Sequence, residues 1–160
     1  MAQPLTLPSV DRSPVRRAFA PRLDELRHTP KLSSDENLAR LTSVNVLVVG
    51  AENEAVALVA SLWPSFVTPI VARHRGEPLR LSTVPPAGTF VIYDLETLTP
   101  IEQDGLHQWL NAGSGARVVS CGSASLFPMV ESGAFSDGLY YRLNGVRIDL
   151  TSPVRSHPQD

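Results

Sequence analysis

The run Val46-Leu47-Val48-Val49-Gly50 decides the fold, because four consecutive apolar residues that end in a glycine are typical of a strand buried on both faces of a parallel sheet. A helix is expected directly after it. From Glu54 to Leu62 the apolar side chains recur with a helical period, and Trp63-Pro64 ends the segment. A buried strand followed by a helix is the building unit of an α/β fold.

Further strands are predicted along the chain from similar patterns. Residues 89–93 and 117–121 are mostly apolar, which predicts two more buried strands. Residues 146–150 alternate between apolar and charged side chains, which predicts a last strand. Residues 67–72 are a weaker candidate for an edge strand, since Pro69 interrupts them.

Helices are expected between these strands. They are predicted over residues 33–41, 100–110, 126–131 and 137–143. The second of them is expected to face the core with Ile101, Leu106, Trp109 and Leu110. Strands and helices that alternate in this order predict a three-layer α/β/α sandwich around a mostly parallel sheet.

The composition suits one soluble globular domain, with 160 residues, 42% hydrophobic residues and a formal net charge of -2. Residues 1–32 are basic and proline-rich without a hydrophobic period, so we expect a disordered, solvated arm there. Residues 33–152 are expected to form the core and residues 153–160 a tail. No direct DNA contact is expected beyond the arm.

The lack of a membrane or export signal and the presence of a single cysteine limit the expected cellular location and redox chemistry. The chain shows no signal-peptide pattern and no run of about 18 apolar residues, so we expect a cytoplasmic protein without membrane contact. Cys121 is the single cysteine, which excludes an intramolecular disulfide. Its apolar neighbours favour a buried structural thiol over a nucleophile.

Residues 135–144, Phe135-Ser136-Asp137-Gly138-Leu139-Tyr140-Tyr141-Arg142-Leu143-Asn144, carry a family resemblance. They resemble the pattern "FREDLYYRLN" of the sigma-54 interaction domain, the AAA+ ATPase core of bacterial sigma-54 activators. The family's pattern holds two arginines that reach the nucleotide of a neighbouring subunit. Ser136 replaces the first and Arg142 keeps the second, so the resemblance implies a possible arginine finger acting in trans. The alternative is that Arg142 holds the fold through Asp137 or Asp149.

The resemblance, which covers about residues 44–152, also implies where a phosphate-binding loop would lie. Against the family pattern "GExGTGKE", the chain has Val56 in place of the lysine, and Asn53 and Ala55 in place of glycines. Glu52 and Glu54 would repel a polyanion there. The vestigial loop comprises Gly50, Ala51, Glu52, Asn53, Glu54, Ala55 and Val56.

Two further motifs of the family correspond to altered residues. Residues 88–94 match the pattern "GTLFLDE", which puts Tyr93 at the metal-organising aspartate and leaves Asp94 as a Walker-B remnant. Glu96 is expected to project from the following loop. Residues 117–126 resemble the sensor segment "RVIAATNRDL", with Ser123 as the sensor-like residue. No metal site is predicted, because His28, His74, His107 and His157 are scattered.

The departures from the family pattern decide the expected function. The interval between Ser65 and Pro86 is too short for the family's sigma-54-contacting loop, and its helical lid is not expected in this chain. We therefore predict a catalytically inactive regulatory or scaffold protein without a cofactor. Its expected contacts are with sigma-54 activator subunits or with itself, through a surface that carries Tyr140, Tyr141 and Arg142. One alternative is a weak ATP-binding protein or slow ATPase that uses ATP and Mg²⁺, and another is a fragment without a selected role.

Overall fold

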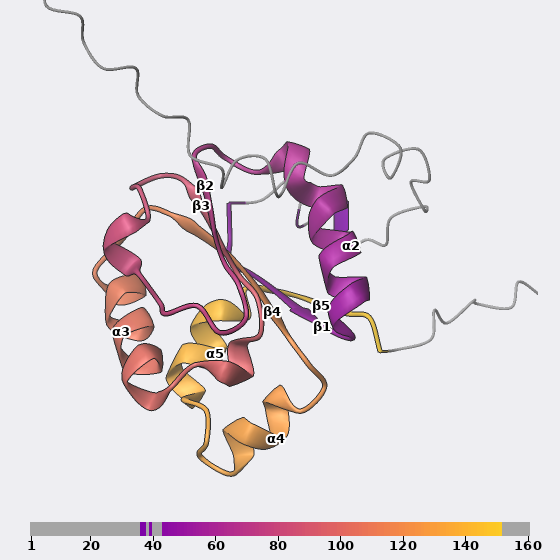
Figure 1. Cartoon of the computed structure of the whole chain (residues 1–160), viewed down its shortest axis with the longest axis vertical. Helices are drawn as coiled ribbons and strands as arrows, with labels where there is room; N and C mark the ends of the chain where they lie inside the picture. Colours follow the sequence, from indigo (N-terminus) through magenta and orange to yellow (C-terminus); the bar gives the residue numbers. More distant parts are fainter. Residues whose placement is uncertain (1–35, 38, 40–42, 152–160) are drawn as a thin grey trace, which may run out of the picture.

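The computed structural model describes residues 36, 37, 39 and 43–151. Five strands form one sheet with the order β2-β3-β4-β1-β5, and every neighbouring pair runs parallel (Figure 1). The strands are β1 (Val46–Val49), β2 (Ile70–Arg73), β3 (Thr89–Ile92), β4 (Arg117–Gly122) and β5 (Val146–Asp149). The predicted α/β fold with a parallel sheet is therefore confirmed.

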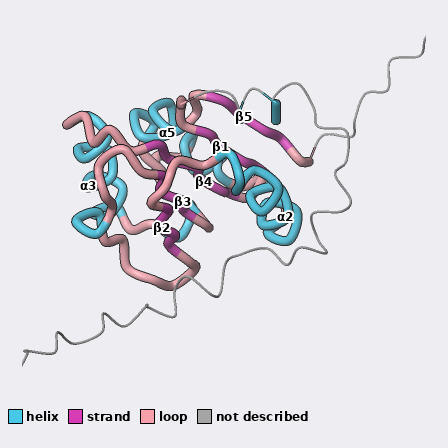
Figure 2. Tube along the Cα trace, turned by 90° about the horizontal axis from the view of Figure 1, so that it is seen from above, coloured by secondary structure: helices cyan, strands magenta, loops and turns pink. Residues whose placement is uncertain are grey.

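The helices cover both faces of the sheet. Figure 2 shows α2 on one side of the sheet and α3 with α5 on the other. The helices are α2 (Glu52–Leu62), α3 (Pro100–Asn111), α4 (Leu126–Glu131) and α5 (Asp137–Leu143), and the single 3-10 turns are η3 (Trp63–Ser65), η4 (Leu81–Thr83) and η5 (Leu95–Thr97). In the helix predicted over residues 33–41, the three residues that the structure describes are helical. The predicted arm at residues 1–32 and the tail at 153–160 lie outside the described residues.

Each face of the sheet has its own hydrophobic core, because successive residues of a strand point to opposite faces. On the α2 face, Val48 and Val119 belong to one buried cluster with Leu58, Val59 and Leu62. The opposite face holds the second cluster, which includes Leu47, Phe90, Ile92, Leu106, Leu110, Leu139 and Leu143. Two cores on one sheet confirm the three-layer arrangement. None of the helices in the described part of the chain is long and apolar enough to span a bilayer.

One predicted core residue is wrong. Ile101 is 84% exposed, because α3 buries the side that carries Gln103, Leu106 and Leu110, and Ile101 lies on the other side. Gln103 is buried instead, with its amide donating to the carbonyls of Leu98 (3.0 Å) and Ala134 (3.3 Å). The Gln103 side-chain oxygen accepts from the backbone N–H of Ser136 (2.8 Å). A buried amide is tolerated here because both of its ends are hydrogen-bonded.

The predicted edge strand is confirmed, but it begins later than expected. β2 starts at Ile70, after Pro69, and pairs only with β3 at the edge of the sheet. The carbonyl of Pro69 still accepts from the backbone N–H of Thr89 (3.0 Å), whereas a proline nitrogen has no hydrogen to donate. Between Ser65 and Pro86 the chain forms only β2 and η4, so this interval holds no α-helix.

Candidate functional site

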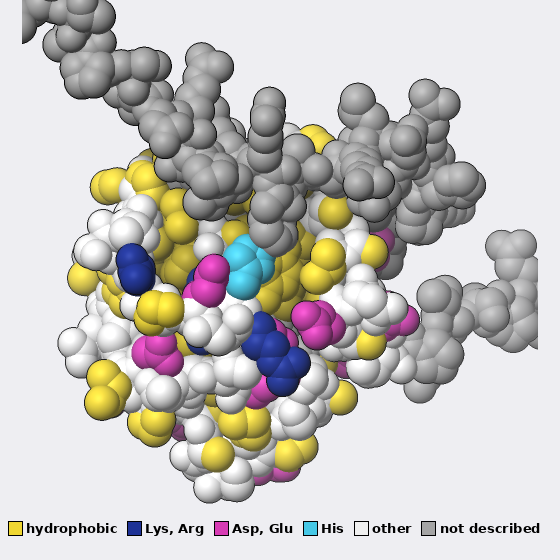
Figure 3. Space-filling view, viewed as in Figure 1, with side chains coloured by type: hydrophobic (Ala, Val, Ile, Leu, Met, Phe, Trp, Pro, Cys, Tyr) yellow, Lys and Arg dark blue, Asp and Glu magenta, His cyan; other side chains and the backbone are white. Residues whose placement is uncertain are grey.

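A cavity of about 180 Å³ opens at the carboxyl ends of β1, β3 and β4. This is the edge at which parallel α/β sheets commonly hold their ligands. Figure 3 shows acidic and basic side chains next to one another, beside a histidine, near the middle of the face that it presents. The cavity is lined by Gly50, Glu52, Ala55, Arg75, Tyr93, Asp94, Glu96, Thr97, Cys121, Gly122 and Ser123. A hollow of about 290 Å³ that shares four of these residues adds Val56 and His74 to the site.

The connection between β1 and α2 is shorter than the sequence predicted. α2 begins at Glu52 rather than Glu54, so only Gly50 and Ala51 join the strand to the helix. The rest of the predicted vestigial loop, from Glu52 to Val56, is helical. Residues 51–56 contain no glycine that would favour an open loop, and carboxylates in a first helical turn are stabilised by the helix dipole.

One backbone N–H at this connection is already hydrogen-bonded. The N–H of Gly50 donates to the carbonyl of Gly122 at the end of β4 (3.0 Å). A Cβ atom at Gly50 would lie 2.7 Å from the Cβ of Leu150, so glycine is needed where these two segments meet. This N–H is therefore not a free donor for a phosphate group.

The predicted loop residues divide into three groups. Gly50, Glu52 and Ala55 line the cavity, and Val56 lines the adjoining hollow. Ala55 is 3% exposed and belongs to the core on the α2 face. The residues that line neither space are Ala51, Asn53 and Glu54.

Asp94, the predicted Walker-B remnant, lines the cavity. It follows β3 in a left-handed conformation (φ 54°, ψ 63°), and its carbonyl accepts from the N–H (3.0 Å) and the hydroxyl (2.7 Å) of Thr97. The Oδ2 atom of Asp94 is buried without a hydrogen-bond partner among the described residues. Burial raises the pKa of Asp94, and the carboxylates of Glu52 and Glu96 raise it further.

Glu96 does not project away from the site, which corrects the prediction. The η5 turn directs its side chain to the end of β4, where Oε1 accepts from the N–H of Ser123 (3.0 Å). Its Oε2 atom is buried and has no hydrogen-bond partner within the described chain. The hydroxyl of Ser123 lies 2.6 Å from that of Ser125. Both polar groups of the predicted sensor-like residue are thus engaged by the protein itself.

Burial keeps Tyr93 and Cys121 neutral. Burial raises the pKa of Cys121 to about 12, and that of the Tyr93 phenol is also raised, again mainly by burial. Cys121 is 4% exposed, which confirms the predicted structural thiol. Tyr93 stacks on His74, with ring centroids 5.3 Å apart and planes inclined by 17°.

The basic residues near the cavity were missed by the sequence prediction. Arg75 lines it, and Arg73 is buried beside it with Nη1 donating to the carbonyl of Tyr93 (3.1 Å) and the hydroxyl of Thr97 (3.2 Å). The signal was the sequence Arg73-His74-Arg75 at the end of an edge-strand candidate. Parallel strands end on one edge of the sheet, so this run joins the residues that follow β1, β3 and β4.

Arg142 lies away from the cavity. Its carbonyl accepts from the side-chain amide of Asn45 (3.0 Å), which places the end of α5 near the amino ends of β1 and β5. Its side chain is exposed, and its guanidinium has no ion pair within residues 43–151. The predicted site residues at the cavity therefore do not include Arg142.

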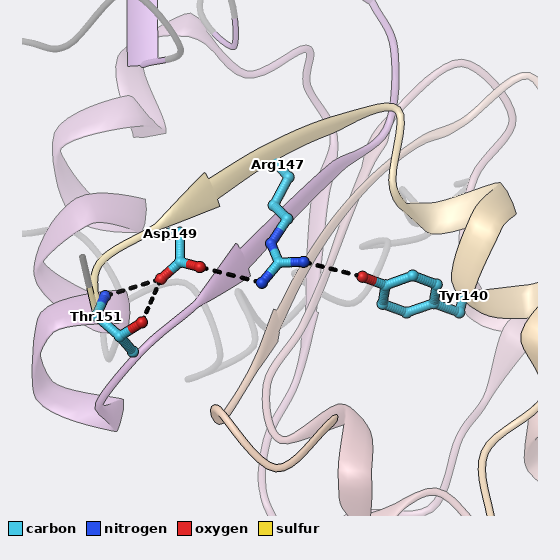
Figure 4. A network of polar contacts seen from close by, with 4 residues as sticks. All are labelled: Tyr140, Arg147, Asp149 and Thr151. Atoms are coloured by element: carbon cyan, nitrogen blue, oxygen red, sulfur yellow. Dashed lines mark hydrogen bonds and ion pairs between the residues drawn. The ribbon is translucent and has the colours of Figure 1, made fainter. Parts of the chain in front are cut away.

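The alternative that Arg142 holds the fold through Asp149 is wrong. Asp149 pairs with Arg147 (3.0 Å), and Arg147 also donates to the hydroxyl of Tyr140 (3.1 Å), as Figure 4 shows. Thr151 donates to Asp149 from its N–H (3.0 Å) and its hydroxyl (2.5 Å). These hydrogen bonds, with that of the Thr151 side chain first, lower the pKa of Asp149. Asp137 accepts instead from the N–H of Gly138 (2.7 Å).

The charges at the cavity oppose the binding of a polyanion. Three carboxylates line it, from Glu52, Asp94 and Glu96, against the single guanidinium of Arg75. Phosphate sites in this type of fold instead present free backbone N–H groups and a lysine. Among the described residues, no group of three or more His, Cys, Asp or Glu side chains is arranged to hold a metal ion.

Asp94→Asn is expected to stabilise the protein at about pH 7 by roughly 1 kcal/mol, because it removes the charge from a carboxylate whose buried oxygen lacks a partner. The pKa of Asp94 is raised by folding, so its ionised form opposes the fold above that pKa. The stability that Asp94→Asn gains over the parent protein should therefore shrink as the pH falls through the raised pKa of Asp94 toward the ordinary pKa of an aspartate. Urea unfolding at both ends of this range measures it.

The matched control for this variant is Asp104→Asn, on the exposed side of α3. Its free energy of unfolding should stay within about 0.5 kcal/mol of that of the parent protein. A loss of stability at neutral pH in Asp94→Asn would mean that the carboxylate is paired in solution and that the unsatisfied oxygen is not a feature of the folded protein.

Solved structures support the fold. The structure of NtrX from Brucella abortus in complex with ADP aligns with a TM-score of 0.57 at 16% identity, covering 84% of this chain and 38% of NtrX. The P-loop NTPase domain of the Sigma-54 transport activator from E. coli aligns with a TM-score of 0.50 at 21% identity, covering 66% of this chain and 95% of that domain. The chain thus spans well under half of the length of NtrX.

Sequence comparison gives the family. No curated protein matches the chain. The sequence model of the sigma-54 interaction domain, the AAA+ core of transcription activators, matches residues 30–152. This match covers most of the chain, including the cavity and α5, and agrees with the all-parallel sheet. The chain therefore belongs to the sigma-54 interaction domain family.

Proposed function

We propose that this chain is a catalytically inactive member of its family, which acts in transcription regulation through protein–protein contacts as a regulatory or scaffold protein. The observation that carries the proposal is the β1–α2 connection. Only Gly50 and Ala51 lie between the strand and the helix, and the side chain of Glu52 lines the cavity. A triphosphate would meet a helical turn and a carboxylate where the family has a glycine-rich loop and a lysine.

The other parts of the site support the same conclusion. The N–H of Ser123 is used by Glu96, and Tyr93 stands where the family has the metal-organising aspartate. Asp94 alone remains as a Walker-B remnant. On this proposal ATP and Mg²⁺ are not cofactors of the chain.

The proposed partners are subunits of sigma-54 activators. The contact surface predicted from the sequence is partly exposed, with Tyr141 at 70% and Arg142 also exposed, whereas Tyr140 is 4% exposed and belongs to the core. An exposed arginine beside an exposed aromatic ring is a common anchor at protein interfaces. Such a subunit would change ATP hydrolysis by an activator ring without hydrolysing ATP itself.

A weak ATP-binding protein or slow ATPase is the second candidate. The observation in its favour is that the cavity lies at the family's nucleotide position and includes the guanidinium of Arg75. A single guanidinium opposite three carboxylates would support only weak binding.

Titration calorimetry with Mg-ATP and Mg-ADP distinguishes the two candidates. No binding heat is expected, because the phosphate-binding loop is replaced by helix. Binding tighter than about 100 μM, near -5.5 kcal/mol, would contradict the proposal and favour the second candidate. The double variant Glu52→Ala, Glu54→Ala is also expected to give no binding heat with either nucleotide. If the double variant gains binding, the carboxylates rather than the helical loop are the obstacle.

The partner proposal has its own test. Added protein should change the ATP hydrolysis rate of a sigma-54 activator, and Arg142→Ala should abolish the change. Arg80→Ala, which removes an exposed arginine of another segment, is the control and should behave as the parent protein. An unchanged hydrolysis rate together with no recovery of an activator in a pull-down would contradict this part of the proposal.

A further inference from the structure

The strand β5 forms one edge of the sheet and carries two opposite charges. Within the described residues it pairs only with β1, so its other side is open. The side chains of Arg147 and Asp149 on β5 are 39% and 31% exposed, and Figure 4 shows them beside one another along the strand. An edge strand presents unpaired backbone N–H and C=O groups, to which a further strand can add.

The backbone hydrogen bonds of β5 show which of its residues face the open side. The N–H groups of Val146 and Leu150 donate to carbonyls in or directly before β1 (2.9 and 2.8 Å). Along a strand, the backbone groups of successive residues point alternately to one side and to the other. The N–H and C=O groups of Arg147 and Asp149 therefore point away from β1.

The side chains of Arg147 and Asp149 share one face of the sheet. They form an ion pair (3.0 Å), and Arg147 also donates to the hydroxyl of Tyr140 on α5 (3.1 Å). Ile148, which lies between them in the chain, is 3% exposed and belongs to the core on the α2 face. The open edge of β5 thus carries one positive and one negative side chain, placed symmetrically about Ile148.

We propose that two copies of this chain associate through β5, and that the two strands run antiparallel about Ile148 and join the two sheets into one. In this register Arg147 of each copy lies opposite Asp149 of the other. Both positions face the open side, so each such pair exchanges two backbone hydrogen bonds, and Ile148 meets Ile148 of the second copy in the non-hydrogen-bonded pair between them. Opposite charges at opposed positions stabilise such a pairing.

Other pairings of these edges fit the charges less well. Parallel addition of β5 to β5 in the same register would place like charges side by side, which is destabilising. The other edge strand, β2, turns the carbonyl of Arg73 toward β3, so its outward positions are the uncharged Ile70 and Ala72. Charges on an edge strand usually discourage addition of another strand. Here their order makes β5 complementary to a second copy of itself.

The β5 edge is separate from the cavity described above. No residue of β5 lines the cavity or the adjoining hollow. The association therefore requires nucleotide neither to be present nor to be absent, and the inference goes beyond the proposed function without depending on it.

Sedimentation velocity of the full chain from about 5 to 200 μM tests the proposal. The parent protein should form a dimer and nothing larger, because a two-fold contact uses the β5 edge of both copies. Arg147→Asp leaves only carboxylates at the outward positions, and Asp149→Arg leaves only guanidinium groups. Each should raise the dissociation constant at least about tenfold. Arg80→Asp, the same charge change at an exposed residue of another segment, should dimerise as the parent protein does.

Two combinations of these substitutions give a sharper result. A mixture of Arg147→Asp with Asp149→Arg should form a heterodimer, because each strand then offers two charges of one sign to two of the other sign. The double variant Arg147→Asp, Asp149→Arg exchanges the charges within one chain and should dimerise again. Thermal unfolding of each variant shows that it is folded, which separates a lost contact from a lost structure.

Hydrogen exchange locates the contact on the protein. The backbone amides of Arg147 and Asp149 should exchange more slowly at about 200 μM than at about 5 μM, because they become hydrogen-bonded in the dimer. The amides of Ile70 and Ala72 on the opposite edge should exchange at the same rate at both concentrations.

Four outcomes would overturn the proposal. They are a parent protein that stays monomeric over the whole range, a dimer that neither single variant weakens, a mixture of the two variants that stays monomeric, and protection that appears away from β5. Each of these results leaves the proposed function standing, since that function is tested by calorimetry with nucleotide and by the hydrolysis rate of an activator.

Discussion

Phe90→Ala is expected to lower the free energy of unfolding by about 3 to 5 kcal/mol, because it empties a closely packed position in the sheet. Phe90 is 2% exposed in β3, and its ring meets Trp109 edge-on with centroids 6.2 Å apart. It belongs to the core between the sheet and α3. Typical domains have a free energy of unfolding of only about 5 to 15 kcal/mol, so Phe90→Ala would remove a large part of it. Urea unfolding measures the loss.

Phe127→Ala is the matched control, since Phe127 is 45% exposed on α4. The same substitution there should cost well under half as much as at Phe90, because nearly half of the Phe127 side chain already contacts water. Equal losses at the two positions would contradict the burial of β3 between its neighbours. That result would also undermine the position of Asp94, which directly follows this strand region.

Arg117→Ala is expected to destabilise the protein by about 3 kcal/mol, since hydrogen bonds from a charged donor are among the stronger ones. Arg117 is 6% exposed, with Nε donating to the carbonyl of Val44 (3.0 Å) and Nη2 donating to that of Ala39. Its guanidinium lies 5.7 Å from the ring centroid of Phe66. The buried charge therefore ties the segment before β1 to β4. Burial also lowers the pKa of Arg117.

Arg147→Ala provides the comparison for a surface arginine. The Arg147 side chain is 39% exposed and pairs with Asp149, and exposed ion pairs contribute at most about 1 kcal/mol. In thermal and urea unfolding, Arg117→Ala should therefore be clearly less stable than Arg147→Ala. If the two variants unfold alike, the segment before β1 does not depend on the Arg117 contacts.

The repeating pattern of the sequence predicted most of the architecture. β1 and the helices α4 and α5 have the predicted bounds, and the strands at residues 89–93 and 117–121 differ from prediction by one residue. These segments are bounded by local signals such as Gly50 and Ser136, whose hydroxyl accepts from the N–H of Leu139 (3.3 Å) at the start of α5. Local signals of this kind act without reference to the rest of the chain.

The errors arose from side-chain partners that the hydrophobic pattern does not reveal. Glu96 turns toward the cavity because the N–H of Ser123, which directly follows β4, donates a hydrogen bond to it. Asp149 pairs with Arg147 rather than Arg142 because these two side chains lie on the same face of β5, two residues apart. Ile101 does not face the core because the first turn of α3 buries Gln103 instead, whose amide is hydrogen-bonded to the backbone of Ala134 and Ser136. Periodicity carries no information about such partners.

By itself, the sequence determined the α/β class, the family resemblance and the altered positions Asn53, Ala55 and Val56, because each depends on residues that are close together in the chain. Only the tertiary structure decided that the loop after β1 is helix from Glu52, that Arg75 joins three carboxylates in one cavity, and that Arg142 lies at the opposite end of the sheet. The reason is physical: the positions of Arg75 and Arg142 depend on which strand ends meet at one edge of the sheet, and packing across the sheet sets that.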